Sequence, residues 1–164
     1  MPGESLQDIY VEQLQDLYSA EQQILKALPK MADAATHDDL RRAFKEHEVM
    51  TRTHVERLDR IFTQLGQKPG GHKCKGMEGL IAEGEELLEE HDESDALDAA
   101  MIAAAQRVEH YEIAGYGSVR TFANMLGLGD HADLLQQTLD EEGQTDKRLT
   151  TLAETVVNID AVQE

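Results

Sequence analysis

Aromatic side chains are scarce in this sequence: tryptophan is absent, and the aromatic fraction is 4%. Proline occurs only three times, and stretches in which Val, Ile or Thr alternate with polar residues are almost missing, so β-strands have little support. Ala, Leu, Glu and Gln dominate instead, and these are good helix formers. A chain of 164 residues favours one domain, 1–164, that buries a core. We expect an all-α protein.

Cysteine is nearly absent too, because Cys74 is the single one and cannot form an internal disulfide. A reducing compartment is the simple inference. The first residues contain no basic and apolar leader, and no stretch approaches the length of a membrane span. We therefore expect a cytoplasmic protein that does not enter a membrane.

Basic residues are outnumbered, with 15 Lys and Arg against 33 Asp and Glu and a formal net charge of −18. A nucleic-acid surface needs clustered Lys and Arg that contact phosphates, and anionic membranes also attract basic segments. We therefore expect neither partner. The acidic excess is compatible with the attraction of cations, although most of these carboxylates are expected to be solvated.

Helical periodicity predicts four long helices and one short one. The long helices are expected at about 4–34, 38–65, 94–126 and 131–157, and the crossover of about 66–93 contains a loop and a short acidic helix near 77–91. Pro29 should kink the first helix, and the tail after Val157 should fray. Two long hairpins joined by a crossover are typical of a four-helix bundle. A coiled-coil dimer is the alternative, but the short turns favour helices that fold back on themselves.

Helix starts are predicted from residues whose side chains can cap the first turn. Ser5 with Asp8 resembles a capping box. The later candidates are Thr36 or Asp38 for the second helix, Asp92 or Ser94 for the third, and Asp130 for the fourth.

Each long helix places an acid or a histidine inside its apolar stripe. At about 100° per residue, Glu21 lies about 20° from Leu14 in direction around the first helix. The same arithmetic puts His47 and His54 about 20° apart on the second. The stripes of the last two helices include Glu112 and Glu142, with Glu109 about 60° from Glu112 and Asp146 about 40° beyond Glu142.

These residues also lie at similar depth. Counted from the predicted turns, Glu21, His47, Glu112 and Glu142 all fall about 12 to 16 residues away, so they are level to within roughly one helical turn. Ionised carboxylates buried together repel one another, and each lone buried charge costs several kcal/mol. Protonation or a hydrogen-bond network could relieve this repulsion, but a bound cation does so directly. Oxygen and imidazole ligands suit iron, manganese or zinc.

Each of these residues also has a simpler interpretation. A single charge at the edge of a stripe often reaches solvent through its flexible stem, and Glu109 lies on such an edge. His54 fits a hydrogen-bonded core histidine. Coincidence on all four helices at one depth nevertheless favours a metal site.

At these residues the sequence resembles the YciE/YciF family of ferritin-like bacterial proteins. The resemblance covers nearly the whole chain, through the segments DLYSAEQQILKALPKM, AFKEH, GMEGLIAEG, AAQRVEHYEIAGYGS and TLDEEGQTDKRLTTLA. It implies a ferritin-like bundle, usually a homodimer, that is associated with bacterial stress responses.

The resemblance also implies metal ligands. Glu21 matches the first-helix ligand of ferritin-like proteins, Glu109 and Glu112 match the two-glutamate spacing of rubrerythrin-like members, and Glu142 matches the fourth-helix acid. Asp146 stands where some relatives have histidine.

The second helix departs from the ferritin-like pattern Glu-x-x-His. It has Met50 where the acid is expected, leaving His47 as the leading nitrogen donor. Either Glu48 or His54 could compensate, and one metal or two remain open.

Three functions are compatible with these residues. The first is a ferritin-like metal-binding protein, with iron as the leading ion, that acts in stress response. The second is a non-catalytic structural dimer without a functional metal, and the third is an oxidoreductase that reacts with peroxide or dioxygen. The sequence reveals ligand types and not turnover, so enzymatic activity is left undecided.

Overall fold

The described residues 5–163 of the computed structural model are mostly helical, and no strand is assigned within them. The all-α prediction is thereby confirmed. The expected start of the first helix, Glu4, lies outside the described residues. The elements are α1 (Leu6–Ala34), α2 (Asp38–Leu65), α3 (Lys75–Glu90), α4 (Asp95–Met125), α5 (Gly129–Leu152), the π-helical segment η1 (Ala153–Val157) and α6 (Asn158–Gln163).

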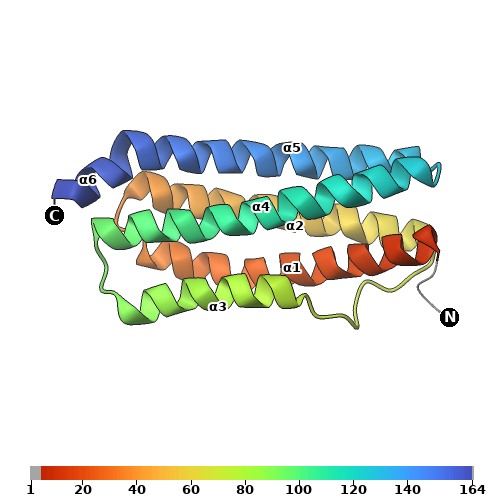
Figure 1. The fold of residues 1–164 in the computed structure, drawn as a ribbon, viewed down its shortest axis with the longest axis horizontal. Helices are drawn as coiled ribbons and strands as arrows, with labels where there is room; N and C mark the ends of the chain where they lie inside the picture. Colours follow the sequence, from red (N-terminus) through yellow and green to blue (C-terminus); the bar gives the residue numbers. More distant parts are fainter. Residues whose placement is uncertain (1–4, 164) are drawn as a thin grey trace.

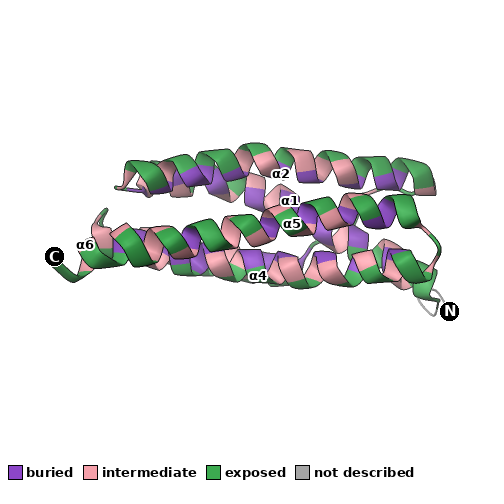
Figure 2. Ribbon diagram, turned by 90° about the horizontal axis from the view of Figure 1, so that it is seen from above, coloured by how far each residue is buried: buried purple, intermediate pink, exposed green. Residues whose placement is uncertain are grey.

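Four long helices lie side by side along the length of the molecule (Figure 1). Helix α1 packs on α2 and helix α4 packs on α5, while the crossover helix α3 lies outside this bundle against α1 and α4. The buried residues follow the faces that the helices turn toward one another (Figure 2). The architecture is the predicted four-helix bundle of two hairpins with an extra helix in the crossover.

The apolar core consists of two clusters, one in each half of the bundle. One, which we call the Phe44 cluster, includes Ile24, Leu28, Phe44, Met101, Ala105 and Leu149. The other, which we call the Tyr10 cluster, includes Tyr10, Leu14, Leu17, Leu58, Tyr116, Val119 and Leu135. On every long helix the buried residues between the two clusters are polar, so a polar layer divides the core at mid-length.

Local sequence signals account for several helix ends. The Ser5 hydroxyl accepts a hydrogen bond from the Asp8 N–H at 3.0 Å, and the Ser94 hydroxyl accepts one from the Leu97 N–H at 3.0 Å, as predicted. Helix α2 ends at Gly66, whose φ of 65° is left-handed and costs glycine little. Helix α1 remains a single helix through Pro29 and ends at Ala34.

The caps of two helices were predicted wrongly. His37 is the N-cap residue of α2 and makes no side-chain capping bond; instead, Asp98 of α4 accepts the Thr36 N–H at 2.9 Å and the His37 N–H at 2.8 Å. Helix α5 begins at Gly129 after Leu128, also without a side-chain cap, so Asp130 lies inside the helix. A cap supplied by another helix leaves no signal in the neighbouring residues.

The C-terminal tail is helical from Asn158 to Gln163, which corrects the expectation of fraying for these residues. His37 holds it in place, because Nδ1 lies 2.6 Å from Oδ2 of Asp98 and Nε2 lies 2.9 Å from Oδ2 of Asp160 in α6. A third carboxylate, Asp95, lies 3.6 Å from Nε2. This His37 contact joins the start of α2 to α4 and to the last helix.

The His37 contact predicts a pH dependence of stability. Hydrogen bonds to Asp160 and Asp98 raise the pKa of His37 above 6.5, although burial acts to lower it. Since the pKa is higher in the folded state, the stabilising contribution is complete below pH 6.5 and is lost as pH rises through the raised pKa. We expect His37→Asn, which keeps an amide donor for Asp98, to have a flatter profile of unfolding midpoint between about pH 6 and 9.

Urea denaturation at a series of pH values measures this difference. His91→Asn, an exposed position after α3, is the control and should follow the wild-type profile. Identical pH profiles for wild type and His37→Asn would contradict the assignment.

Candidate metal centre

The polar layer gathers side chains from all four long helices. The members are Glu21 of α1, His47 and His54 of α2, Glu109 and Glu112 of α4, and Glu142 of α5, and each is at most 7% exposed. The two hairpins bring them together because each helix passes the same level between the Phe44 and Tyr10 clusters. All five residues proposed as leading ligands from the sequence therefore converge, and so does His54.

The donor atoms form two groups that share one residue. Glu21, His54, Glu112 and Glu142 form the first group, and His47, Glu109 and Glu142 form the second, with donor atoms in each group within 4.8 Å of one another. In the first group, Nδ1 of His54 lies 2.9 Å from Oε1 of Glu142. In the second, Nε2 of His47 lies 3.2 Å from Oε1 of Glu109. The arrangement offers two adjacent positions bridged by Glu142.

Most of these donor atoms point at one another without forming hydrogen bonds. Tyr116 donates to Oε1 of Glu21 at 3.2 Å. Within the described part of the chain, the buried atoms without a hydrogen-bond partner include Oε2 of Glu21, both ring nitrogens of His54, and both carboxylate oxygens of Glu109, Glu112 and Glu142. Buried polar atoms are nearly always satisfied, and each exception costs about 1–3 kcal/mol. Converging lone pairs of this kind fit a cation.

Close approach of α1 and α4 brings the first group together. A Cβ atom on Gly115 would lie 2.7 Å from Cδ2 of Leu17, so glycine allows α4 to approach α1 here. Gly115 lies between Glu112 and Tyr116, the two α4 residues nearest to Glu21 in this layer. A larger residue at this position would move the α4 donors away from α1 or displace Leu17.

Protonation states in the layer are strongly perturbed. Burial raises the pKa of Glu109 and Glu112 well above the ordinary range, and the neighbouring carboxylates Glu21 and Glu142 raise it further. Burial also acts to raise the pKa of Glu142, but contacts with Glu109 and His54 outweigh it and lower this pKa to about 2. These shifts favour the protonated forms of Glu109 and Glu112 and the ionised form of Glu142 in the metal-free layer.

The two histidines differ in charge. Burial acts to lower the pKa of His54, but contacts with Glu142 and Glu21 outweigh it and raise the pKa to about 10. For His47 burial dominates and lowers the pKa. The lowered pKa favours a neutral His47 with a lone pair available to a metal, whereas the raised pKa favours a protonated His54 in the metal-free layer.

Two of the less favoured sequence candidates lie outside both groups. Glu48 contacts Arg52 at 2.7 Å on the outer side of α2, and Asp146 contacts His110 at 3.2 Å. Met50, found where the ferritin-like pattern has an acid, accepts a hydrogen bond from Thr145 at 3.7 Å. Of the two residues that could compensate for Met50, His54 joins the first group and Glu48 joins neither.

The number of carboxylate and imidazole donors in the layer nevertheless equals that of a ferritin-like two-metal centre. Ferritin-like two-metal centres use four carboxylates and two histidines, with Glu-x-x-His on two of the helices. Here both imidazoles come from α2, as His47 and His54 two turns apart, and the layer again contains four glutamates. The sequence places His47 and His54 about 20° apart around the helix, but it leaves Glu48 and His54 as equal alternatives, and only the packed helices separate the two.

Residues 5–162 match the family described as Domain of unknown function (DUF892). The chain belongs to this family. This DUF892 member is 44% identical over 159 residues to Protein YciF of Escherichia coli (strain K12), with 96% of each chain covered. The resemblance to the YciE/YciF family is confirmed.

Solved structures agree with the fold of this DUF892 member. The crystal structure of the E. coli stress protein YciF matches with a TM-score of 0.90 and 44% identity over 94% of this chain and 98% of that one. YcfI of Rhodopseudomonas palustris matches with a TM-score of 0.87 and 44% identity over 90% and 94% of the two chains.

A more distant match identifies the fold class. It is a two-domain protein of Anabaena variabilis with DJ-1/ThiJ/PfpI-like and ferritin-like domains, which matches with a TM-score of 0.67 and 18% identity over 95% of this chain and 39% of that one. The DUF892 member therefore has a ferritin-like fold. Across residues 5–163, no helix has the length and apolar character needed to cross a membrane.

The protonated layer predicts that a neutral substitution stabilises the metal-free protein. Because the pKa of Glu112 is raised above 4.5 on folding, its contribution to stability is present below pH 4.5 and is lost as pH rises. Glu112→Gln does not titrate, so at pH 8 we expect the chelator-treated variant to be about 1–3 kcal/mol more stable than wild type. Urea denaturation measures the difference.

Glu89→Gln, exposed on α3, is the matched control and should stay within about 0.5 kcal/mol of wild type. The assigned protonation would be wrong if Glu112→Gln had a lower free energy of unfolding than wild type at pH 8 and if this difference in free energy did not become smaller as pH rises.

Proposed function

We propose that this protein binds one or two transition-metal ions in the polar layer, with iron as the leading ion and manganese or zinc as alternatives. The observation that carries the proposal is the convergence of six buried donors, most of whose atoms have no hydrogen-bond partner among the described residues. A cation removes both the electrostatic repulsion and the unsatisfied lone pairs. Imidazole and carboxylate ligands suit these divalent ions.

Each residue has a defined role in this proposal. Glu21, His54, Glu112 and Glu142 would hold the first ion, and His47 and Glu109 would hold the second, because Glu142 belongs to both groups of donor atoms and would serve either ion. Tyr116 orients Glu21 through its hydroxyl, as outer hydrogen bonds commonly do for ligating carboxylates. Four donors face the first position and three face the second, so the second has more room for an exogenous ligand.

A bound iron pair would supply electrons to dioxygen or peroxide. The protein side chains would exclude bulk water, because the layer lies between two apolar clusters, and would release protons as the ions bind. The sequence match to the E. coli stress protein YciF supports a role in bacterial stress response. The expectations of a homodimer, of a cytoplasmic location and of no nucleic-acid partner stay predictions.

Metal stoichiometry tests the proposal, because Glu142 is shared and His47 is not. Loaded anaerobically with Fe(II) and then desalted, the wild type is expected to retain up to two ions per chain. His47→Asn should retain about one, and Glu142→Ala should lose most of both. Elemental analysis measures the content, and Co(II) spectra check the ligand geometry.

Glu48→Ala is the matched control, since Glu48 faces Arg52 outside the layer, and it should retain the wild-type content. Metal content near zero in the wild type, unchanged by Glu142→Ala, would reject the proposal and favour a purely structural protein.

A further inference from the structure

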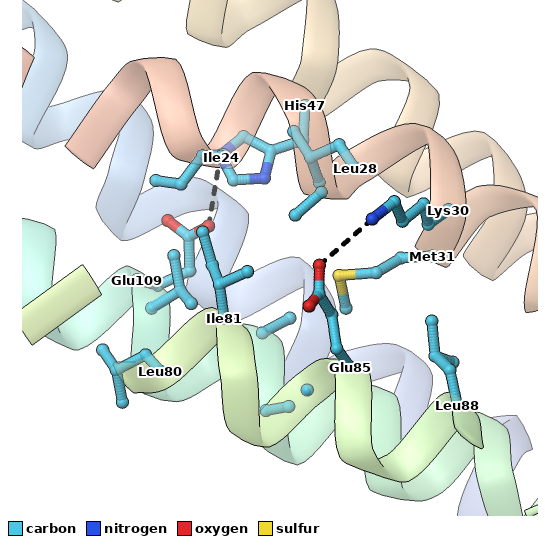
Figure 3. A pocket seen from close by; sticks show the side chains of 15 residues that line it. Ile24, Leu28, Lys30, Met31, His47, Leu80, Ile81, Glu85, Leu88 and Glu109 are labelled. Carbon is cyan, nitrogen blue, oxygen red and sulfur yellow. Dashed lines mark hydrogen bonds and ion pairs between the residues drawn. The ribbon is translucent and has the colours of Figure 1, made fainter. Parts of the chain in front are cut away.

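The crossover helix α3 encloses an apolar cavity that leads to the second metal position. The cavity lies between α1, α3 and α4, and its walls include Ile24, Leu28, Met31, Ile81, Leu88 and Val108. Figure 3 shows Ile24, Leu28, Met31, Ile81 and Leu88 around the cavity, with the His47–Glu109 pair on one side and the Lys30–Glu85 ion pair on another. His47 and Glu109 are buried, whereas Lys30 and Glu85 are 61% and 44% exposed. The cavity therefore connects the surface to the layer.

The size and polarity of the cavity define what it can hold. Its volume is about 40 Å³, well below the roughly 150 Å³ of a protein cavity that binds benzene, so acyl chains and rings are excluded. A bound water needs about two to four polar partners, and the walls between the two ion pairs are hydrocarbon. Peroxide and anions have the same requirement for polar partners. An uncharged molecule of two or three atoms fits both limits.

A second hollow, between α2 and α5, also adjoins His47 and has a different character. It has a similar volume, about 50 Å³, but its lining includes Glu46, Met50, Thr145 and Arg148. Glu46 and Arg148 form an ion pair there. Polar ligands have partners in this hollow that the cavity under α3 lacks.

We propose that the cavity enclosed by α3 binds a small, uncharged, apolar molecule of the size of dioxygen and places it beside His47 and Glu109. One part of this inference rests on the proposed function, namely that the molecule would meet a metal ion beside His47 and Glu109. Occupation of the cavity itself needs no metal. Helix α3, which the four-helix plan does not require, contributes the outer wall through Leu80, Ile81, Gly84 and Leu88.

Two glycines on α3 provide a matched pair of variants. Gly84 lines the cavity, whereas Gly79 is exposed one and a half turns earlier and does not. A Cβ atom at either position meets nothing within 4 Å, so neither substitution forces a clash with the backbone. Gly84→Leu should fill the cavity, while Gly79→Leu adds the same side chain and the same gain in helix propensity outside it.

Xenon binding tests the cavity without metal or activity. Xenon occupies dry apolar cavities, so crystals of metal-free protein under xenon pressure should show anomalous scattering between α1, α3 and α4. Gly79→Leu should retain this site and Gly84→Leu should lose it. Absence of xenon from the wild-type cavity, or unchanged xenon in Gly84→Leu, would overturn the proposal.

Nitric oxide, an uncharged diatomic molecule, tests the connection to the layer. In protein that holds Fe(II), we expect its association rate by stopped-flow absorbance to fall about tenfold in Gly84→Leu and to be unchanged in Gly79→Leu. Azide, an anion, should bind at the same rate in both. Equal nitric oxide rates in the two variants would overturn the route to the layer.

The two proposals fail separately in these experiments. A xenon site without retained Fe(II) would reject the metal centre and leave the cavity, whereas retained Fe(II) without a xenon site would reject the cavity alone.

Discussion

Six titratable side chains meet in the dry middle of this bundle, and the rest of the structure depends on how their charge is balanced. Without a cation, the raised pKa values of Glu109 and Glu112 and of His54 keep protons in the layer. Protons reduce the repulsion but leave most donor atoms without hydrogen-bond partners among the described residues. Burial of so many unsatisfied groups opposes folding, so a functional reason for their position is required.

The surrounding fold supplies the rigidity that such a layer needs. The Phe44 and Tyr10 clusters pack on either side of it, and they exclude the water that would otherwise solvate the carboxylates. Gly115 lets α4 approach α1 at this level, and Asp98 joins the start of α2 to α4. Side chains held by packing on rigid helices keep their geometry better than side chains on loops. Helix α3 adds an apolar cavity that extends from the exposed Lys30–Glu85 pair to His47 and Glu109 of the layer.

Features that depend on neighbouring residues were predictable, and features that depend on distant ones were not. Ser5 and Ser94 cap their helices through the N–H three residues later, which is a short-range pattern. The cap of α2 comes from Asp98, about 60 residues along the chain, and the tail is held by His37 from the other hairpin. Periodicity placed Glu21, Glu112 and Glu142 on inner faces, but it gave His54 and Glu48 similar standing. Only the packed helices separated them.

The sequence by itself determined the all-α class, the four-helix plan and the presence of acids on every inner stripe, because the periodicity of a helix is a local property of the chain. The tertiary structure decided which of those acids meet. In the folded chain the donors form two groups that share Glu142, and both imidazoles come from α2. Asp146 and Glu48 lie outside these two groups. Distances between side chains on different helices depend on crossing geometry and close approach, and neither is encoded in the spacing of residues along one helix.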